Sequence, residues 1–140
     1  MAILVDTGPL YALSDRDDQY HNQVESYVAS CQESLIVPSP VVPEVCYLLR
    51  EHLTVEAELH FLRSLAAQEL VLEHPTSNDL KRVIEILEQY RESEFGMVDA
   101  CIMAMAERLK IQVILTLDRR DFGIIRPKHC KVFRLAPEMS

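Results

Sequence analysis

The chain has 140 residues, a formal net charge of −8 and a hydrophobic content of 49%. This length suits one core, so we expect residues 1–140 to form a single domain, and the apolar content excludes a disordered chain. No basic leader is present and no apolar run approaches the roughly 18 residues of a membrane span, so we expect a cytoplasmic protein without a membrane partner. The excess of acids also excludes a broad basic face for nucleic acid.

Short apolar runs alternate with amphipathic segments along the whole chain. We expect strands at residues 2–5, 35–37, 70–72, 113–117 and 132–135. We expect helices around residues 10–13, 19–31, 40–49, 55–67, 78–90 and 97–109. Strands that alternate with helices are typical of an α/β domain with a mainly parallel sheet.

The sequence predicts the start of the third helix and the inward face of the helix at 78–90. Ser39 is a candidate cap for the third helix, with Pro40 at its first position. Pro43 lacks an N–H group, so it must fall within the first turn of that helix. In the helix at 78–90, the periodicity predicts an inward face made of Leu80, Val83, Ile84 and Leu87.

Cysteine and histidine spacing predicts neither a disulfide framework nor a zinc site. Cys31, Cys46, Cys101 and Cys130 include no Cys-x-x-Cys unit, so we interpret them as reduced thiols that fill space. The histidines show no His-x-x-x-His spacing, and we interpret them as surface or structural residues.

Acidic residues directly follow two of the predicted strands. Asp6 comes after the run at 2–5, and Asp118 comes after the run at 113–117. In an open parallel sheet, ligands bind outside the carboxyl ends of the strands, so both side chains can face one pocket. Crowded carboxylates raise each other's pKa unless a cation neutralises them. The pattern therefore suggests a site for Mg²⁺ or Mn²⁺ and metal-assisted phosphodiester chemistry.

Two further acids lie at helix starts. Asp99 stands near the beginning of the 97–109 helix, which is apolar on nearly every side until Glu107. Burying an unpaired charge costs several kcal/mol, so an acid in such company favours a functional role. Glu44 lies in the first turns of the helix that begins at Pro40, next to its apolar face.

Each acid also has an ordinary structural interpretation. Asp6 precedes Thr7-Gly8-Pro9 and could be a helix cap, while Glu44 could be a solvated acid near a helix N-terminus. Asp118 and Asp121 flank two arginines and could belong to a polar turn after a strand. Their joint occurrence at strand ends and helix starts is what favours a common site. Hydroxyl groups that could orient these carboxylates are those of Thr7 and Thr116.

The sequence resembles the PIN domain, and most closely the VapC-type toxins of bacterial toxin–antitoxin pairs. The matching segments are residues 4–10, 43–45, 96–100 and 115–122. The resemblance implies a three-layer α/β/α sandwich around a mainly parallel sheet. It also implies a ribonuclease that depends on Mg²⁺ or Mn²⁺, forms a homodimer and is inhibited by a cognate antitoxin protein.

The resemblance assigns roles to the acids and hydroxyls. The acidic catalytic site would consist of Asp6, Glu44, Asp99 and Asp118. Asp6, Asp99 and Asp118 would bind the metal, and RNA would be the substrate. Supporting positions would be Thr7, Thr116 and Asp121, the last at a position that varies in the family.

Three other interpretations remain open. A phosphate-accepting receiver domain would need an acidic pair after the first strand and a lysine after the last core strand, whereas here a single acid follows the first strand and Lys128 lies in the wrong place. An aspartate-nucleophile phosphatase would need a second aspartate two residues after Asp6, where Gly8 stands. The third is a non-catalytic interaction module with the same fold, against which the complete acid set argues.

Overall fold

The computed structural model describes residues 2–138, which contain a five-stranded sheet in the order β3-β2-β1-β4-β5. All four neighbouring strand pairs are parallel. The strands are β1 (Ala2–Val5), β2 (Ser34–Pro38), β3 (Val71–Glu73), β4 (Val113–Leu115) and β5 (Arg134–Ala136). The predicted parallel sheet is therefore confirmed.

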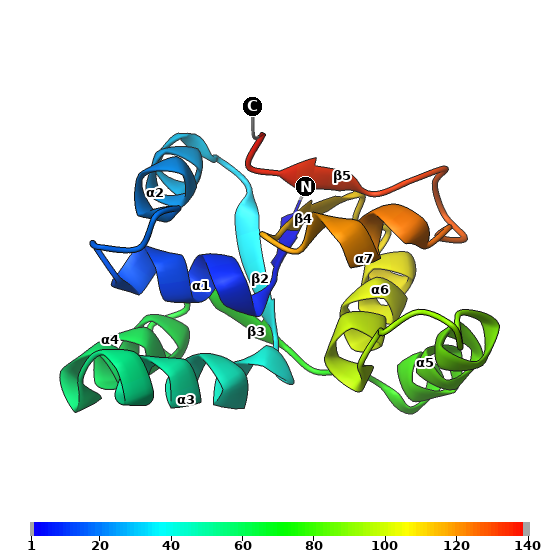
Figure 1. Ribbon diagram of the computed structural model, residues 1–140, viewed down its shortest axis with the longest axis horizontal. Coiled ribbons are helices and arrows are strands. Elements are labelled where there is room, and N and C mark those ends of the chain that lie inside the picture. Colours follow the sequence, from blue (N-terminus) through cyan, green and yellow to red (C-terminus); the bar gives the residue numbers. More distant parts are fainter. Residues whose placement is uncertain (1, 139–140) are drawn as a thin grey trace.

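Helices cover both faces of this sheet. They are α1 (Thr7–Ser14), α2 (His21–Ser30), α3 (Val41–His52), α4 (Val55–Ala66), α5 (Ser77–Gln89), α6 (Met97–Leu109) and α7 (Arg119–Ile124). Figure 1 shows α1 to α4 on one side of the sheet and α5 and α6 on the other, with α7 close to α6. The arrangement confirms the predicted three-layer sandwich. No helix within residues 2–138 is long and apolar enough to cross a membrane.

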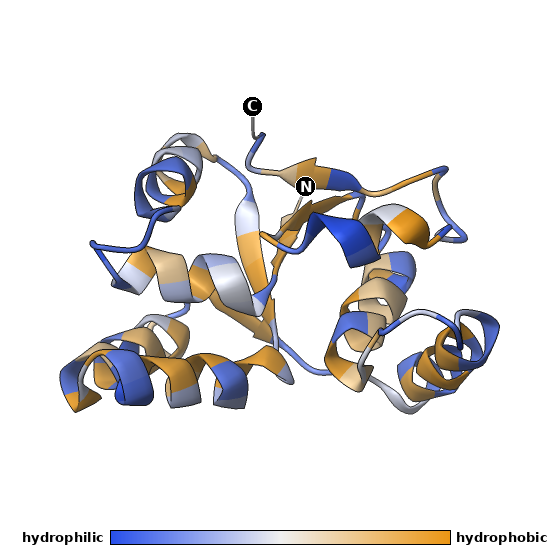
Figure 2. Cartoon of the chain, viewed as in Figure 1, coloured by the Kyte–Doolittle hydropathy of each residue, from blue (hydrophilic) through white to orange (hydrophobic). Residues whose placement is uncertain are grey.

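The core lies between these layers. Leu4, Ile114 and Leu115 are fully buried because their strands are covered on both faces, which explains why the strands are continuously apolar. Figure 2 shows the strands largely in the hydrophobic colour, whereas hydrophobic and hydrophilic residues alternate along the helices around them. Helix α6 is buried continuously from Ala100 to Glu107, as its sequence predicted.

The observed boundaries depart from the sequence predictions in several places. Strand β4 ends at Leu115, and the chain then forms helix α7 where only a polar turn had been considered. Asp118 caps α7 by accepting from the Asp121 backbone, and buried Phe122 anchors the helix to the core. Strand β5 begins two residues later than the predicted run.

The start of α3 differs from the predicted cap but satisfies the proline constraint. Pro40 itself occupies the N-cap position, and no side chain caps the helix. Pro43 is the third residue of α3, so the N–H group that it lacks would have had no partner within the helix. The helix therefore runs without a break through the segment that carries Glu44.

The predicted inward face of α5 is wrong in part. Val83 and Ile86 are buried, whereas Leu80 and Ile84 are 43% and 56% exposed. Helix α5 packs mainly on α6. The residues that this contact buries, Asp79, Val83 and Ile86, form a narrower stripe that is shifted by one position from the predicted face. Periodicity identified the helix but not which of two adjacent apolar stripes faces the core.

Candidate active site

The topology brings the predicted acids to one edge of the sheet. Strands β1 and β4 are neighbours, with Val5 beside Leu115, and the Asp6 N–H donates to the Leu115 carbonyl at 2.9 Å. The chain therefore leaves both strands at the same place. Asp6 directly follows β1, as predicted, whereas Asp118 stands three residues after the end of β4 and not directly after the strand.

Asp6 is held by a short chain of hydrogen bonds. Its Oδ1 accepts from the Thr7 N–H at 2.8 Å, and its Oδ2 accepts from the Thr116 hydroxyl at 2.8 Å. The Thr116 Oγ1 also accepts from the Asp118 N–H at 2.9 Å. Thr116 is fully buried, so one hydroxyl fixes both the Asp6 carboxylate and the backbone that carries Asp118.

Glu44 is connected to the same group through a second hydroxyl. The Thr7 Oγ1 donates to Glu44 Oε1 at 2.7 Å, which joins the start of α1 to the first turn of α3. Thr7 thus contacts Asp6 with its backbone and Glu44 with its side chain. Both predicted supporting hydroxyls lie against the acids that they were expected to orient.

The remaining three acids form the tightest cluster. Carboxylate oxygens of Asp99, Asp118 and Asp121 all lie within 4.8 Å of one another. Hard oxygen donors at this spacing suit a divalent cation such as Mg²⁺ or Mn²⁺. This set differs from the predicted metal ligands because it includes Asp121 and not Asp6, whose oxygens accept hydrogen bonds from Thr7 and Thr116. Asp121 enters because α7 turns it back beside Asp118.

Burial and mutual repulsion raise the pKa of several of these groups. Desolvation and the charges of Asp6 and Asp118 raise the pKa of Asp99 to about 7. Burial also raises the pKa of Asp6, although hydrogen bonds from Thr7 and Thr116 oppose the shift. Burial and Asp118 raise the pKa of Asp121. Carboxylates perturbed in this way are typical of a site that a cation completes.

The Thr116 hydroxyl offers a direct test of this network. Thr116→Val keeps the shape of the side chain but leaves Asp6 Oδ2 without a donor and the Asp118 N–H without its acceptor. We expect Mn²⁺ affinity to fall by about 10- to 100-fold, the usual effect of removing a group that orients a ligand. Calorimetric titration measures this, and Thr116→Ser, which keeps the hydroxyl, should bind nearly as well as the wild type. Equal affinities in all three proteins would contradict the role.

Arg119, which directly follows Asp118, is partly buried and does not lie in a solvated turn. Nε and Nη2 of Arg119 are buried and have no hydrogen-bond partner. Arg120 is the exposed one, with a distant ion pair to Glu94 at 3.9 Å. The sequence held no signal that separates the two, because only the orientation of α7 decides which arginine faces inward.

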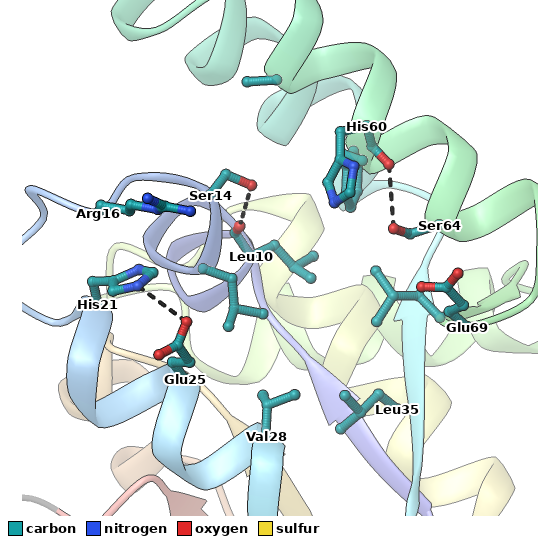
Figure 3. A pocket seen from close by; sticks show the side chains of 14 residues that line it. Leu10, Ser14, Arg16, His21, Glu25, Val28, Leu35, His60, Ser64 and Glu69 are labelled. Carbon is teal, nitrogen blue, oxygen red and sulfur yellow. Dashed lines mark hydrogen bonds and ion pairs between the residues drawn. The ribbon is translucent and has the colours of Figure 1, made fainter.

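A cavity of about 490 Å³ lies away from the acids between α1, α2 and α4. Figure 3 shows apolar side chains such as Leu10, Val28 and Leu35 around it, with His21 beside Glu25. The Nδ1 atom of His21 is hydrogen-bonded to the Ala12 carbonyl at 2.7 Å. Its Nε2 atom lies 3.3 Å from Oε2 of Glu25. This histidine therefore joins α1 to α2, which agrees with the structural role expected for it.

Comparison with known proteins identifies the class. The model of the PIN domain family matches residues 3–126. Ribonuclease VapC26 of Mycobacterium tuberculosis is 33% identical over 125 residues, which cover 89% of this chain and 93% of that protein. The chain therefore belongs to the PIN domain family, among its VapC-type members. The resemblance predicted from the sequence is confirmed.

Solved structures agree with this fold. The crystal structure of Mycobacterium tuberculosis VapC20, described as a sarcin-ricin loop cleaving toxin, matches with a TM-score of 0.78 and 24% identity, covering 84% of this chain and 91% of that one. VapBC2 from Rickettsia felis, solved bound to a DNA fragment from its promoter, matches with a TM-score of 0.68 and 17% identity, covering 97% and 98%.

Proposed function

We propose that this protein is a ribonuclease that depends on Mg²⁺ or Mn²⁺ and is the toxin of a toxin–antitoxin pair. The observation that carries the proposal is the convergence of five carboxylates from four separate elements on one edge of a parallel sheet. The 33% identity to a protein named as a ribonuclease supports RNA as the substrate. The reaction is the hydrolysis of a P–O bond of the RNA backbone.

The acids divide into three roles. Asp99, Asp118 and Asp121 offer the closest set of oxygens for the cation, and Asp6, buried beside them, adds negative charge to the site. When bound, a divalent ion supplies Lewis acidity toward the phosphate oxygens and lowers the pKa of a water molecule. Glu44, exposed and held by Thr7, is positioned to bind a second ion or to accept a proton from water.

Several properties follow from the family and are part of the same proposal. We propose that residues 1–140 form one domain, that the protein is a homodimer, and that it works in the cytoplasm. A cognate antitoxin protein is the expected partner. The similarity to Rickettsia felis VapBC2 and to a toxin–antitoxin complex from Klebsiella pneumoniae supports that partner.

Removal and return of the metal tests the proposal. The wild-type protein should cleave a mixture of single-stranded RNAs in the presence of Mn²⁺ or Mg²⁺. Cleavage should stop in EDTA and return when excess Mn²⁺ is added, because the acids without a cation only repel phosphate. Asp6→Asn protein, purified identically, should be inactive. Equal cleavage by both proteins would reveal a contaminating nuclease. Failure of the wild type both to cleave RNA and to bind Mn²⁺ by titration would overturn the proposal.

A further inference from the structure

An open, mostly apolar cavity of about 490 Å³ adjoins the acidic site. Tyr47 is 65% exposed, the most exposed large hydrophobic side chain within residues 2–138. It lies four residues after Pro43, so both side chains share one face of α3. The residues that line this cavity are Thr7, Pro43, Glu44, Tyr47 and Leu48.

The cavity and the acidic site share a wall. Thr7 and Glu44 line the cavity and are joined by the 2.7 Å hydrogen bond described above. Thr7 also donates its N–H to Asp6. A polynucleotide whose phosphate reaches the acids therefore places a neighbouring nucleoside over the cavity. Its volume falls within the range of about 300–1,000 Å³ that is usual for small-molecule sites.

The charge of the chain favours such a contact. The chain contains fourteen lysines and arginines and twenty-two aspartates and glutamates, so neutralisation of phosphates by basic side chains contributes less to RNA binding than it does in a basic protein. Stacking of a base on an aromatic ring needs no positive charge and accepts any base, because every base has a π face. An exposed tyrosine beside an acidic site supplies this contact.

We propose that this cavity is a nucleobase subsite, in which an unpaired base next to the scissile phosphate stacks on Tyr47. The inference rests on the proposed function, because it assumes that RNA reaches the acids. Pro43 and Leu48 provide the apolar floor, and Thr7 and Glu44 form the side toward the metal site. Tyr47 thus selects single-stranded RNA, whose bases are free to leave the stack.

The chain contains no tryptophan, so Tyr47→Trp introduces a single fluorescent reporter at the subsite. In an Asp99→Asn background, which leaves RNA intact, a short single-stranded RNA should quench this emission saturably. Ile84→Trp in the same background is the matched control, because Ile84 is 56% exposed on α5, away from the cavity. Its emission should not respond to the RNA.

Affinity gives the second readout. Fluorescence anisotropy with labelled single-stranded RNA should show binding about 10-fold weaker for Tyr47→Ala and unchanged for Tyr47→Phe, which keeps the ring. Circular dichroism verifies that each variant is folded. RNA that binds but neither quenches the Tyr47→Trp reporter nor discriminates Tyr47→Ala would overturn the subsite while leaving the ribonuclease intact. If the tryptophan emission changed with protein concentration but not with RNA, the subsite would also be overturned. This face would then be a contact between two copies of the chain.

Discussion

Asp99→Asn should lower the rate of metal-dependent RNA cleavage by at least about 10³-fold. The variant removes one of the three carboxylates whose oxygens lie within 4.8 Å of one another. A bound ion stabilises the transition state by several kcal/mol, and each 1.36 kcal/mol corresponds to about a tenfold change in rate. Single-turnover cleavage in saturating Mn²⁺ measures the loss. Glu25→Gln, which changes an exposed acid of α2 that pairs with His21 away from the acidic site, is the matched control and should keep full activity.

The same substitution should stabilise the metal-free protein at neutral and higher pH. The pKa of Asp99 is raised from 3.8 to about 7 in the folded state by burial and by its acidic neighbours. Between these values the folded protein retains a proton that the unfolded chain releases, so stability falls as pH rises from about 4 to about 7. The full shift corresponds to about 4 kcal/mol, which solvent screening of this partly exposed group reduces to about 1–2 kcal/mol.

Urea unfolding at pH 5 and pH 8, with and without Mn²⁺, separates these effects. In EDTA the wild type should lose stability between the two pH values, and Asp99→Asn should lose less. Mn²⁺ should restore the wild type at pH 8 and have little effect on the variant, since binding to the folded state alone adds stability. A wild-type protein whose stability rises with pH in EDTA would contradict the charge crowding assigned to this site.

The sequence predicted where the acids gather, because the ends of buried strands can be recognised from their apolar runs. A continuous apolar run followed by an acid marks Asp6 and Asp118, and parallel topology brings such ends together. Asp99 could be identified for a different reason. Helix α6 is apolar on nearly every side before Glu107, so an acidic residue near its start is unusual. These signals depend on local pattern and on general rules of sheet topology, and the structure agrees with both.

Other features of the site depend on side-chain geometry that no local pattern encodes. Asp121 joins the tight cluster only because residues after Asp118 form a helix, which a six-residue segment cannot signal by periodicity. Tyr47 was overlooked because an aromatic residue in an amphipathic helix is normally assigned to the core. Its exposure depends on how α3 is rotated against its neighbours, as does the covered stripe of α5.

A largely buried ion pair between Glu107 and Arg82 lies near the end of α6 opposite to Asp99. Glu107, at the end of the buried part of α6, accepts from Arg82 Nε at 2.7 Å and from Arg82 Nη2 at 3.1 Å. It also accepts from the Lys128 N–H at 2.8 Å, so one carboxylate joins α5, α6 and the segment after α7. Burial opposes its ionisation, but these hydrogen bonds lower its pKa below the ordinary value.

Glu107→Ala should therefore destabilise the protein by about 3–5 kcal/mol, because it leaves the Arg82 guanidinium largely buried with only the 3.4 Å contact to Glu85. Urea unfolding at pH 7 measures the loss. The double variant Arg82→Met/Glu107→Leu removes both charges and should recover most of the stability, since apolar replacements of a buried pair are often neutral or better. A double variant as unstable as the single one would show that the hydrogen bond to Lys128, rather than the stranded charge, is what matters.

The two carboxylates of α6 should respond to pH in opposite directions. The lowered pKa of Glu107 means that its stabilising effect is complete above the unfolded value of about 4.5 and is lost as pH falls through the folded pKa. Asp99 acts in the other direction at higher pH, where its ionisation destabilises the metal-free fold. Without metal, these two groups together favour greatest stability near pH 4 to 5. Bound Mn²⁺ should move that optimum toward neutrality, because it removes the cost at Asp99 and leaves Glu107 unaffected.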